Sequence, residues 1–400
     1  MRKDFGRLIS ILLLFCAFGV SLGCDCIGGA KASGVPAALP VPPAPAPLDP
    51  GRPWHFAVSG DSRNCGDVVM PAIAQGAARD QAKFYWHLGD LRAIYDFDED
   101  MLQTYKMKGQ HLSISEYQKK AWPDFRQNQT VPFGGIPFFL GIGNHETVQD
   151  LKDRDKFSKE FADFLDSKEL KQQREIDAAE QRQPVLPPKT YYHWIMDGVD
   201  FIYLDNATAD QFDADQMKWF EGRLANDGKS GSLVHTVVVG MHEALSYSIS
   251  QGHSMNESPR GEESGRQVYQ DLLKLQNESH KKVYVLASHS HYYMEDVFNT
   301  QYWRSNGGVL AGWIVGTAGA HRYALPEPNS ARVARTNVYG YLLGAVNPTG
   351  QATGTIQFEF KEIKEPDIPQ AIVQGFSQEF VHWCFVNNTD VKSTNAPAQP

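Results

Sequence analysis

The sequence is poor in cysteine, in clustered positive charge and in long apolar runs. Only five of its 400 residues are cysteine, and they do not form the paired pattern of a zinc ribbon. The formal net charge is −9 and no basic cluster is present, which argues against a nucleic-acid-binding surface. No internal repeat is visible, and after Val20 no apolar run is long enough to span a bilayer. The length leaves room for one large domain or two ordinary ones.

The first 23 residues are typical of a secretory signal peptide. A charged stretch from Met1 to Arg7 precedes an apolar run from Leu8 to Val20, which is short for a membrane span. Ser21-Leu22-Gly23-Cys24 then resembles the cleavage site of bacterial lipoproteins, in which the cysteine becomes lipidated. We therefore expect an exported protein, periplasmic or at the cell surface, with a lipid anchor in the membrane at Cys24. A plain signal peptide is the alternative.

The next segment, 24–52, is rich in proline and alanine and is expected to form an extended tether, because such a composition cannot bury a core. A folded domain is expected over 53–363, followed by a partly disordered C-terminal extension over 364–400. Cys65 and Cys384 are the two cysteines beyond the tether. An exported setting permits a disulfide between them, although the sequence alone does not show whether they approach each other.

Five of the expected strands share one feature, which is that each is followed by a residue that can bind a cation. These strands are expected at 55–59, 83–88, 137–140, 234–241 and 282–287. The residues that follow them are Asp61, Asp90, Asn144, His242, and His289 with His291. Ligand sites in open α/β sheets lie beyond the carboxyl ends of strands, so we expect these side chains to converge. A mixture of oxygen and nitrogen donors suits Zn, Mn or Fe better than Ca.

Apolar runs and polar segments with a helical pattern alternate along this part of the chain, which favours an α/β or α+β domain. Segment 96–130 is predicted to be a loop-like surface insertion, and its acidic cluster, Asp96 to Asp100, a solvated face rather than a cation site. Segment 150–183 is predicted to form one or two amphipathic helices. A hairpin is expected to turn at Asp197-Gly198. Further helices are expected at 70–82, 213–225 and 264–276, and later strands within 312–319 and 353–363.

The ordered motifs resemble those of a known superfamily. Gly60-Asp61, Gly89-Asp90, Gly143-Asn144-His145-Glu146, Met241-His242 and His289-Ser290-His291 are similar to the five motifs of the calcineurin-like metallophosphoesterases, which include purple acid phosphatases. The resemblance runs from about Trp54 to Ile363. It implies an α/β (α+β) fold, a four-layer sandwich of two mixed β-sheets flanked by helices.

The resemblance also implies a metal centre in which Asp90 bridges two positions. One metal would be held by Asp61, Asp90 and His291, and the other by Asp90, Asn144, His242 and His289. The implied cofactors are one or two divalent or trivalent transition metals, Mn, Zn or Fe, which would activate a hydroxide for attack on phosphorus. His145 would act as the general acid that protonates the leaving alkoxide.

One position departs from the family pattern. The first motif usually carries a His two residues after its Asp, and this chain has Arg63, whose guanidinium has no lone pair to give. Purple acid phosphatases instead supply a Tyr three residues after the second-motif Asp, and here that position is Ala93, with Tyr95 nearby. Arg63 either points into the site and binds a phosphate oxygen of the substrate, which its place after a strand favours, or pairs with a surface carboxylate.

The sequence therefore predicts an exported enzyme that hydrolyses phosphate mono- or diesters with bound metal. The alternative is a degenerate metallophosphoesterase that serves as a membrane-tethered binding or scaffold module, and Arg63 and Ala93 are its support. Among the other histidines, His87 is predicted to be a buried core residue, and His253 and His321 to lie in loops near the pocket.

Overall fold

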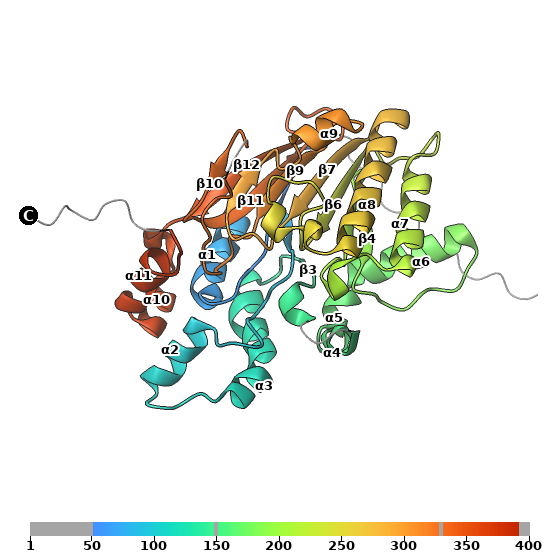
Figure 1. Ribbon diagram of the computed structural model, residues 1–400. Helices are drawn as coiled ribbons and strands as arrows, with labels where there is room; N and C mark the ends of the chain where they lie inside the picture. The colour runs from blue at the N-terminus through green and yellow to red at the C-terminus, as the bar shows by residue number, and fades with distance from the viewer. Residues whose placement is uncertain (1–50, 148–150, 328–330, 392–400) are drawn as a thin grey trace, which may run out of the picture. The chain divides into compact units, whose positions relative to one another are not determined.

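The computed structural model describes residues 51–147, 151–327 and 331–391 (Figure 1). The expected signal peptide, nearly all of the tether and the tail after Val391 lie outside the described residues, so those expectations stay predictions. Within the described ranges, no helix combines the length and the apolar character that crossing a membrane requires.

Two mixed β-sheets form the centre of the fold. The first has five strands in the order β12-β11-β1-β2-β3, and the second has seven in the order β10-β8-β9-β7-β6-β5-β4. The strands of the first are β1 (Trp54–Ser59), β2 (Ala82–His87), β3 (Phe138–Leu140), β11 (Tyr339–Val346) and β12 (Ile356–Ile363). Those of the second are β4 (Tyr192–Met196), β5 (Val199–Leu204), β6 (Thr236–Met241), β7 (Lys282–Ala287), β8 (Tyr293–Glu295), β9 (Ala311–Val315) and β10 (Ala334–Arg335). Strands β1, β2 and β3 run parallel to one another, as do β5, β6, β7 and β9.

Aromatic side chains hold the two sheets face to face. Phe84 of β2 lies 5.2 Å from Trp194 of β4 and 5.0 Å from Phe201 of β5, measured between ring centroids. Phe139 of β3 stacks on Trp194 at 3.8 Å. Large rings bury much apolar area each, and these come from alternate positions of their strands, so one face of each sheet supplies the shared core.

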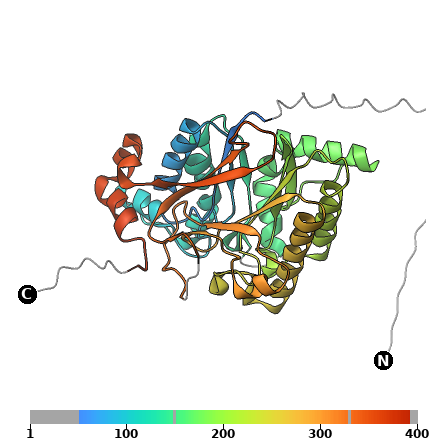
Figure 2. The ribbon, with the colours of Figure 1, turned by 90° about the horizontal axis from the view of Figure 1, so that it is seen from above.

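Helices cover the outer faces of both sheets (Figure 2). The five-stranded sheet packs against α1 (Gly66–Arg79), α10 (Gln370–Phe376) and α11 (Gln378–Val386). The seven-stranded sheet packs against α7 (Ala214–Asp227), α8 (Pro259–Glu278) and α9 (Gln301–Ser305). The four-layer sandwich of two mixed sheets flanked by helices is therefore present, as the sequence predicted.

A disulfide joins the C-terminal helices to the first helix. Cys65, the residue that precedes α1, is bonded to Cys384 of α11, and their Cα atoms are 6.0 Å apart. Both side chains are fully buried in the core between α1 and α11. The pairing that the sequence left open is therefore formed, and it fixes the backbone one residue away from Asn64.

The segment 96–130 differs from its prediction. It folds into α2 (Glu99–Met107), α3 (Ile114–Phe125) and short helical turns at Arg126–Thr130 and Val131–Phe133. Ser113 caps α3 by accepting a hydrogen bond from the backbone N–H of Glu116, and a serine at this position is a start signal for a helix.

The prediction that the acidic cluster is a solvated face is wrong for Asp98 and Asp100, which are fully buried. Both carboxylates face the guanidinium of Arg92, at 3.6 and 2.8 Å. Arg92 is itself fully buried and also pairs with Asp67 and Asp124. A buried charge needs a partner, and this cation holds the carboxylates inside the fold.

Elsewhere the predicted elements are present with shifted ends, but the long strand β11 and the short strands β8 and β10 were missed. The hairpin of β4 and β5 is confirmed, whereas the segment 150–183 forms three helices, α4 (Leu151–Glu160), α5 (Ala162–Leu165) and α6 (Lys168–Gln181). The strand β11 pairs with both β1 and β12. Gly344 weakens its strand signal, but a Cβ there would collide with the ring of Phe56.

Candidate metal centre

Five strand ends meet where the carboxyl edges of the two sheets face each other. Asp61 follows β1, Asp90 follows β2 and Asn144 follows β3, all in the five-stranded sheet. His242 follows β6, and His289 and His291 follow β7, in the seven-stranded sheet. The sheets are joined at this edge because the Nδ1 of His242 and the hydroxyl of Ser288 lie 3.0 Å from the carbonyl oxygen of Leu88 and donate to it.

The backbone at three of these positions is in the left-handed region. The φ angles are 60° at Asp61, 58° at Asp90 and 63° at His289, which side-chain-bearing residues adopt infrequently. Such angles turn the chain sharply as it leaves a strand, and non-glycine residues that adopt them cluster at functional sites. Gly143 allows the tightest approach, since a Cβ at this residue would collide with the carboxylate and the backbone nitrogen of Asp90.

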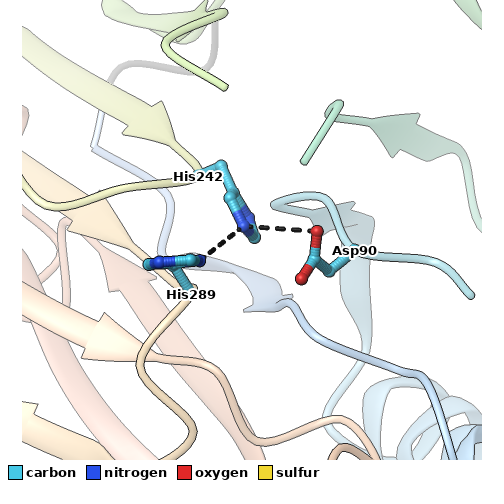
Figure 3. Close-up of side chains that lie close together, drawn as sticks. All are labelled: Asp90, His242 and His289. Carbon is cyan, nitrogen blue, oxygen red and sulfur yellow. Dashed lines mark hydrogen bonds and ion pairs between the residues drawn. The ribbon is translucent and has the colours of Figure 1, made fainter. Parts of the chain in front are cut away.

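Three polar groups converge on one nitrogen of His242, and Figure 3 shows two of them, Asp90 and His289. Its Nε2 lies 2.9 Å from Oδ1 of Asn144, 3.1 Å from Nδ1 of His289 and 3.3 Å from Oδ1 of Asp90. Because Nδ1 of His242 donates to Leu88, Nε2 is the ring nitrogen that faces these three groups. One carboxylate oxygen, one amide oxygen and two imidazole nitrogens are donors that suit a transition metal.

The charges in this cluster are those that metal ligands need. Burial alone would raise the pKa of Asp90, but His145, His242 and Arg63 outweigh it and hold the pKa well below its usual range. Burial, with help from His242, lowers the pKa of His289 to about 3. The carboxylate is therefore ionised and the imidazole neutral, and both have lone pairs for a cation.

Two carboxylate oxygens in the centre support the same interpretation. Within the described residues, Oδ1 of Asp61 and Oδ2 of Asp90 are buried and accept no hydrogen bond. A buried carboxylate oxygen without a donor is costly, and such atoms are rare in folded proteins. These two oxygens therefore fit a positive charge on the side of the centre where Oδ2 of Asp90 lies 3.8 Å from Nε of Arg63.

A second group of possible ligands includes Asp61, Asp90 and His291, whose donor atoms all lie within 4.8 Å of one another. Nδ1 of His291 donates to the carbonyl oxygen of His321 at 2.6 Å, which leaves Nε2 facing the centre, 3.2 Å from Oδ1 of Asp61. This group matches the ligand set that the sequence predicted for the first metal.

Arg63 points into that second group. Its Nη2 is 3.3 Å from Nε2 of His291, and its Nε is 3.8 Å from Oδ2 of Asp90. Its Nη1 contacts His145. Of the two orientations considered for Arg63, the structure shows the inward one, and the alternative of a surface ion pair is wrong.

His145 lies beside the same cluster with its ring held on both sides. Its Nδ1 is 2.8 Å from the carbonyl oxygen of Ala93, and its backbone N–H donates to Oδ1 of Asp90 at 3.0 Å. The hydroxyl of Tyr95 lies 2.9 Å from its Nε2, and the two rings stack at 4.5 Å. Burial lowers the pKa of His145, and Asp90 opposes this effect without overcoming it.

Three supporting residues were not predicted as part of the site. The carboxylate of Glu146 accepts hydrogen bonds from the backbone N–H groups of Asp90, Leu91 and Gly143, at 2.8–2.9 Å, and so joins two motif loops. Its position next to His145 was a signal for this role. Tyr95, which the sequence places near the second motif, reaches His145. Tyr323 stacks on His291 at 4.1 Å, a contact without a signal in the sequence.

Of the remaining predicted histidines, His253 lies near the site as predicted, with its ring 5.5 Å from that of His289, whereas His87 and His321 take structural places. His87 is fully buried and bonds to the hydroxyl of Ser62 at 3.0 Å, so its prediction as a core residue is confirmed. His321 lies near the site through its backbone, since its carbonyl oxygen accepts from His291. The adjacent Arg322 is buried and donates to carbonyl oxygens of the C-terminal segment, at Cys384, Phe385 and Asn388.

Comparison with known proteins gives similar folds at low identity. No family model and no curated protein matches the chain. Purple acid phosphatase PPD1 from yellow lupin (Lupinus luteus) seeds is 15% identical over 78% of this chain and 52% of its own, with a TM-score of 0.49. PhoD is 14% identical over 80% of this chain and 73% of its own, also at 0.49. NAD nucleotidase (NadN) of Haemophilus influenzae is 10% identical over 78% and 49%, at 0.36.

The chain therefore spans about half the length of the lupin phosphatase. With identities of 10–15% and TM-scores below 0.5, we take no functional argument from these similarities.

Proposed function

We propose that this protein hydrolyses phosphate mono- or diesters with the help of a bound transition metal, such as Mn, Zn or Fe. The observation that carries the proposal is the convergence of Asp90, Asn144 and His289 on the Nε2 of His242, at 2.9–3.3 Å. These donors come from separate strand ends of two sheets, so packing of the core alone does not require them to meet.

The residues that would hold the metal are Asp90, Asn144, His242 and His289, with Asp61 and His291 beside them. A metal bound there supplies Lewis acidity, which polarises a phosphoryl oxygen and lowers the pKa of water. The protein's own contribution is to fix these ligands before substrate arrives. Glu146 and the Leu88 carbonyl do this through hydrogen bonds to the loops and to His242.

Arg63 is placed to bind the phosphoryl group of the substrate. Its guanidinium lies within the centre, and its Nε is buried and has no hydrogen-bond partner within the described residues. A guanidinium stays charged and presents planar N–H donors, which suit two oxygens of one phosphate. It would orient the ester and offset the negative charge that develops during displacement at phosphorus.

His145 is placed to give a proton to the leaving group. The Ala93 carbonyl fixes the proton of the neutral ring on Nδ1, so a second proton, held at Nε2, faces the cluster. Transfer of that proton to the leaving alkoxide oxygen releases the alcohol. The stacked ring of Tyr95 keeps the imidazole in this orientation.

We further propose that the enzyme acts outside the cytoplasm, on a lipid anchor at Cys24 with residues 24–52 as the tether. The sequence supports this location, and the disulfide between Cys65 and Cys384 is consistent with an oxidising compartment.

Hydrolysis by purified, metal-loaded protein tests the proposal directly. A panel of phosphate mono- and diesters should include substrates that are cleaved, with activity lost to chelator and regained on adding Mn or Zn. The His242→Ala variant should lose both metal and activity, whereas His111→Ala, which changes an exposed residue far along the chain from any motif, should lose neither. A protein that binds metal and cleaves no ester in the panel would instead be a binding or scaffold module.

A further inference from the structure

The two groups of possible ligands that share Asp90 differ in their relation to Arg63. Asp61, Asp90 and His291 form one group, and Asp90, His242 and His289 form the other. The guanidinium contacts His291 and Asp90 at 3.3 and 3.8 Å. Within the described residues it makes no hydrogen bond or ion pair with Asn144, His242 or His289. A fixed positive charge therefore lies in the first group only.

Two donor atoms of the first group face this cation at short distance. Nε2 of His291 faces Nη2 of Arg63, and Oδ2 of Asp90 faces its Nε. A metal ion there would have to sit against a guanidinium that cannot lose its proton and has no lone pair. Like charges at such short range repel strongly, so the two cations exclude each other.

Arg63 is also held where it is. Its side chain is 15% exposed, and Nη1 contacts His145, whose ring is stacked under Tyr95. The next residue, Asn64, donates its backbone N–H to the buried carboxylate of Asp98 at 2.7 Å. Cys65 follows in the disulfide. The backbone immediately after Arg63 is thus fastened to two other parts of the fold.

We propose that the Arg63 guanidinium takes the place of a second metal, so that the centre binds a single cation through Asp90, Asn144, His242 and His289. Asp61 and His291 then serve as partners that position Arg63. The inference rests on the metal-binding part of the proposed function. It adds that one of the two positive charges of the centre belongs to the protein and is present at every metal concentration.

The test is the number of metal ions bound per chain, measured by titration calorimetry and elemental analysis with Mn²⁺ and Zn²⁺. We expect one equivalent for the native protein. The matched control Arg63→Lys keeps the charge and should also bind one. Arg63→Met removes the charge and leaves three donors, so a second, weaker equivalent should appear. Arg63→His adds a nitrogen donor, and its second equivalent should be tighter than that of Arg63→Met.

The outcomes separate this inference from the proposed function. Two equivalents in the native protein would overturn the inference and leave metal-dependent hydrolysis intact. A single equivalent in both Arg63→Met and Arg63→His, with circular dichroism like the native protein's, would also overturn it. No bound metal in the native protein would overturn both. The electron paramagnetic resonance spectrum of the Mn²⁺ form gives a second readout, a mononuclear signal in the native protein and a spin-coupled pair in Arg63→His.

Discussion

Arg63 and His291 are 228 residues apart in the chain, and Nη2 of the first lies 3.3 Å from Nε2 of the second. This contact places the guanidinium of Arg63, which follows β1, against the imidazole of His291, a possible metal ligand that follows β7. It joins the two sheets at the edge where the other motif residues meet. The chemistry of the centre therefore depends on a protein charge as well as on any bound ion.

Loss of His145 should separate catalysis from metal binding. We expect His145→Ala to reduce kcat by about 10²–10⁴, because proton delivery to the leaving group is lost. The metal content should stay at the native value, since the ring of His145 is not among the proposed ligands. Steady-state kinetics and elemental analysis of the same preparation check both. Equal loss of metal and turnover would show that His145 is structural.

Tyr95 should act by positioning His145. Tyr95→Phe removes the hydroxyl that lies 2.9 Å from Nε2, and the loss of about 1 kcal/mol corresponds to a roughly fivefold lower kcat. Tyr95→Ala also removes the stacked ring and should lower kcat about tenfold more. KM should change little in Tyr95→Phe. Native kcat in both variants would rule out a positioning role.

The disulfide should contribute strongly to stability. Cys65 and Cys384 close a loop with a sequence separation of 319 residues, so their bond restricts the unfolded chain over most of its length. We expect reduction to lower the free energy of unfolding by about 2–5 kcal/mol, measured by guanidinium denaturation. Cys65→Ala/Cys384→Ala provides the control, because reductant should not affect it further. An unchanged native midpoint after reduction would contradict this expectation.

Loss of the proton from buried His193 should make the fold less stable at alkaline pH. His193 is buried in β4, with Asp200 of β5 at 2.8 Å and Asp177 of α6 at 2.7 Å, and Arg223 and Asp227 lie beside these carboxylates. Burial would lower the pKa of His193, but Asp200 and Asp177 outweigh burial and raise it to about 9.

Because the folded pKa lies above the unfolded value, the stabilisation is complete below about pH 6.5 and is lost as pH rises through 9. At about 1.4 kcal/mol per pKa unit, the loss amounts to roughly 3 kcal/mol. Urea unfolding at pH 6 and pH 9.5 measures it. The free energy of unfolding should change less between these two pH values in His193→Gln than in the native protein. An equal change in the variant would assign the effect to other groups.

Removal of Arg92 should destabilise the fold. Arg92→Met leaves four carboxylates without their buried cation, and breaking a buried pair costs about 3–5 kcal/mol. Arg126→Met is the matched control, since its more exposed pairs with Glu160 and Asp163 contribute about 0–1 kcal/mol. Denaturant unfolding of both variants gives the comparison, and equal losses would contradict the structural role of Arg92.

The strand ends could be predicted from sequence because each carries a local signal. The signal is a short apolar run followed by a glycine and then by Asp90 or Asn144. The rule that sites lie at the carboxyl ends of strands predicts that these residues converge. The direction of Arg63 followed from the same rule. These features depend only on neighbours in the chain.

The contacts that were missed depend on distant partners. Nothing near Asp98 indicates that Arg92 will be buried with it, because that depends on how α2 and α3 bring Asp100 and Asp124 to Arg92. The contact of Tyr95 with His145 depends on a turn between Ala93 and Asp98. β11 was missed because a glycine such as Gly344 is a weak signal for a strand. In the fold, the ring of Phe56 leaves no room for a larger residue at that position.

The most direct measurement is a crystal structure of the protein grown with Mn²⁺ and inorganic phosphate, with anomalous diffraction to locate the metal. We expect one strong anomalous peak within bonding distance of Asp90, Asn144, His242 and His289, and phosphate bound between that peak and the Arg63 guanidinium. The absence of a peak at these four residues, or phosphate bound away from both, would contradict a metal-dependent phosphoesterase.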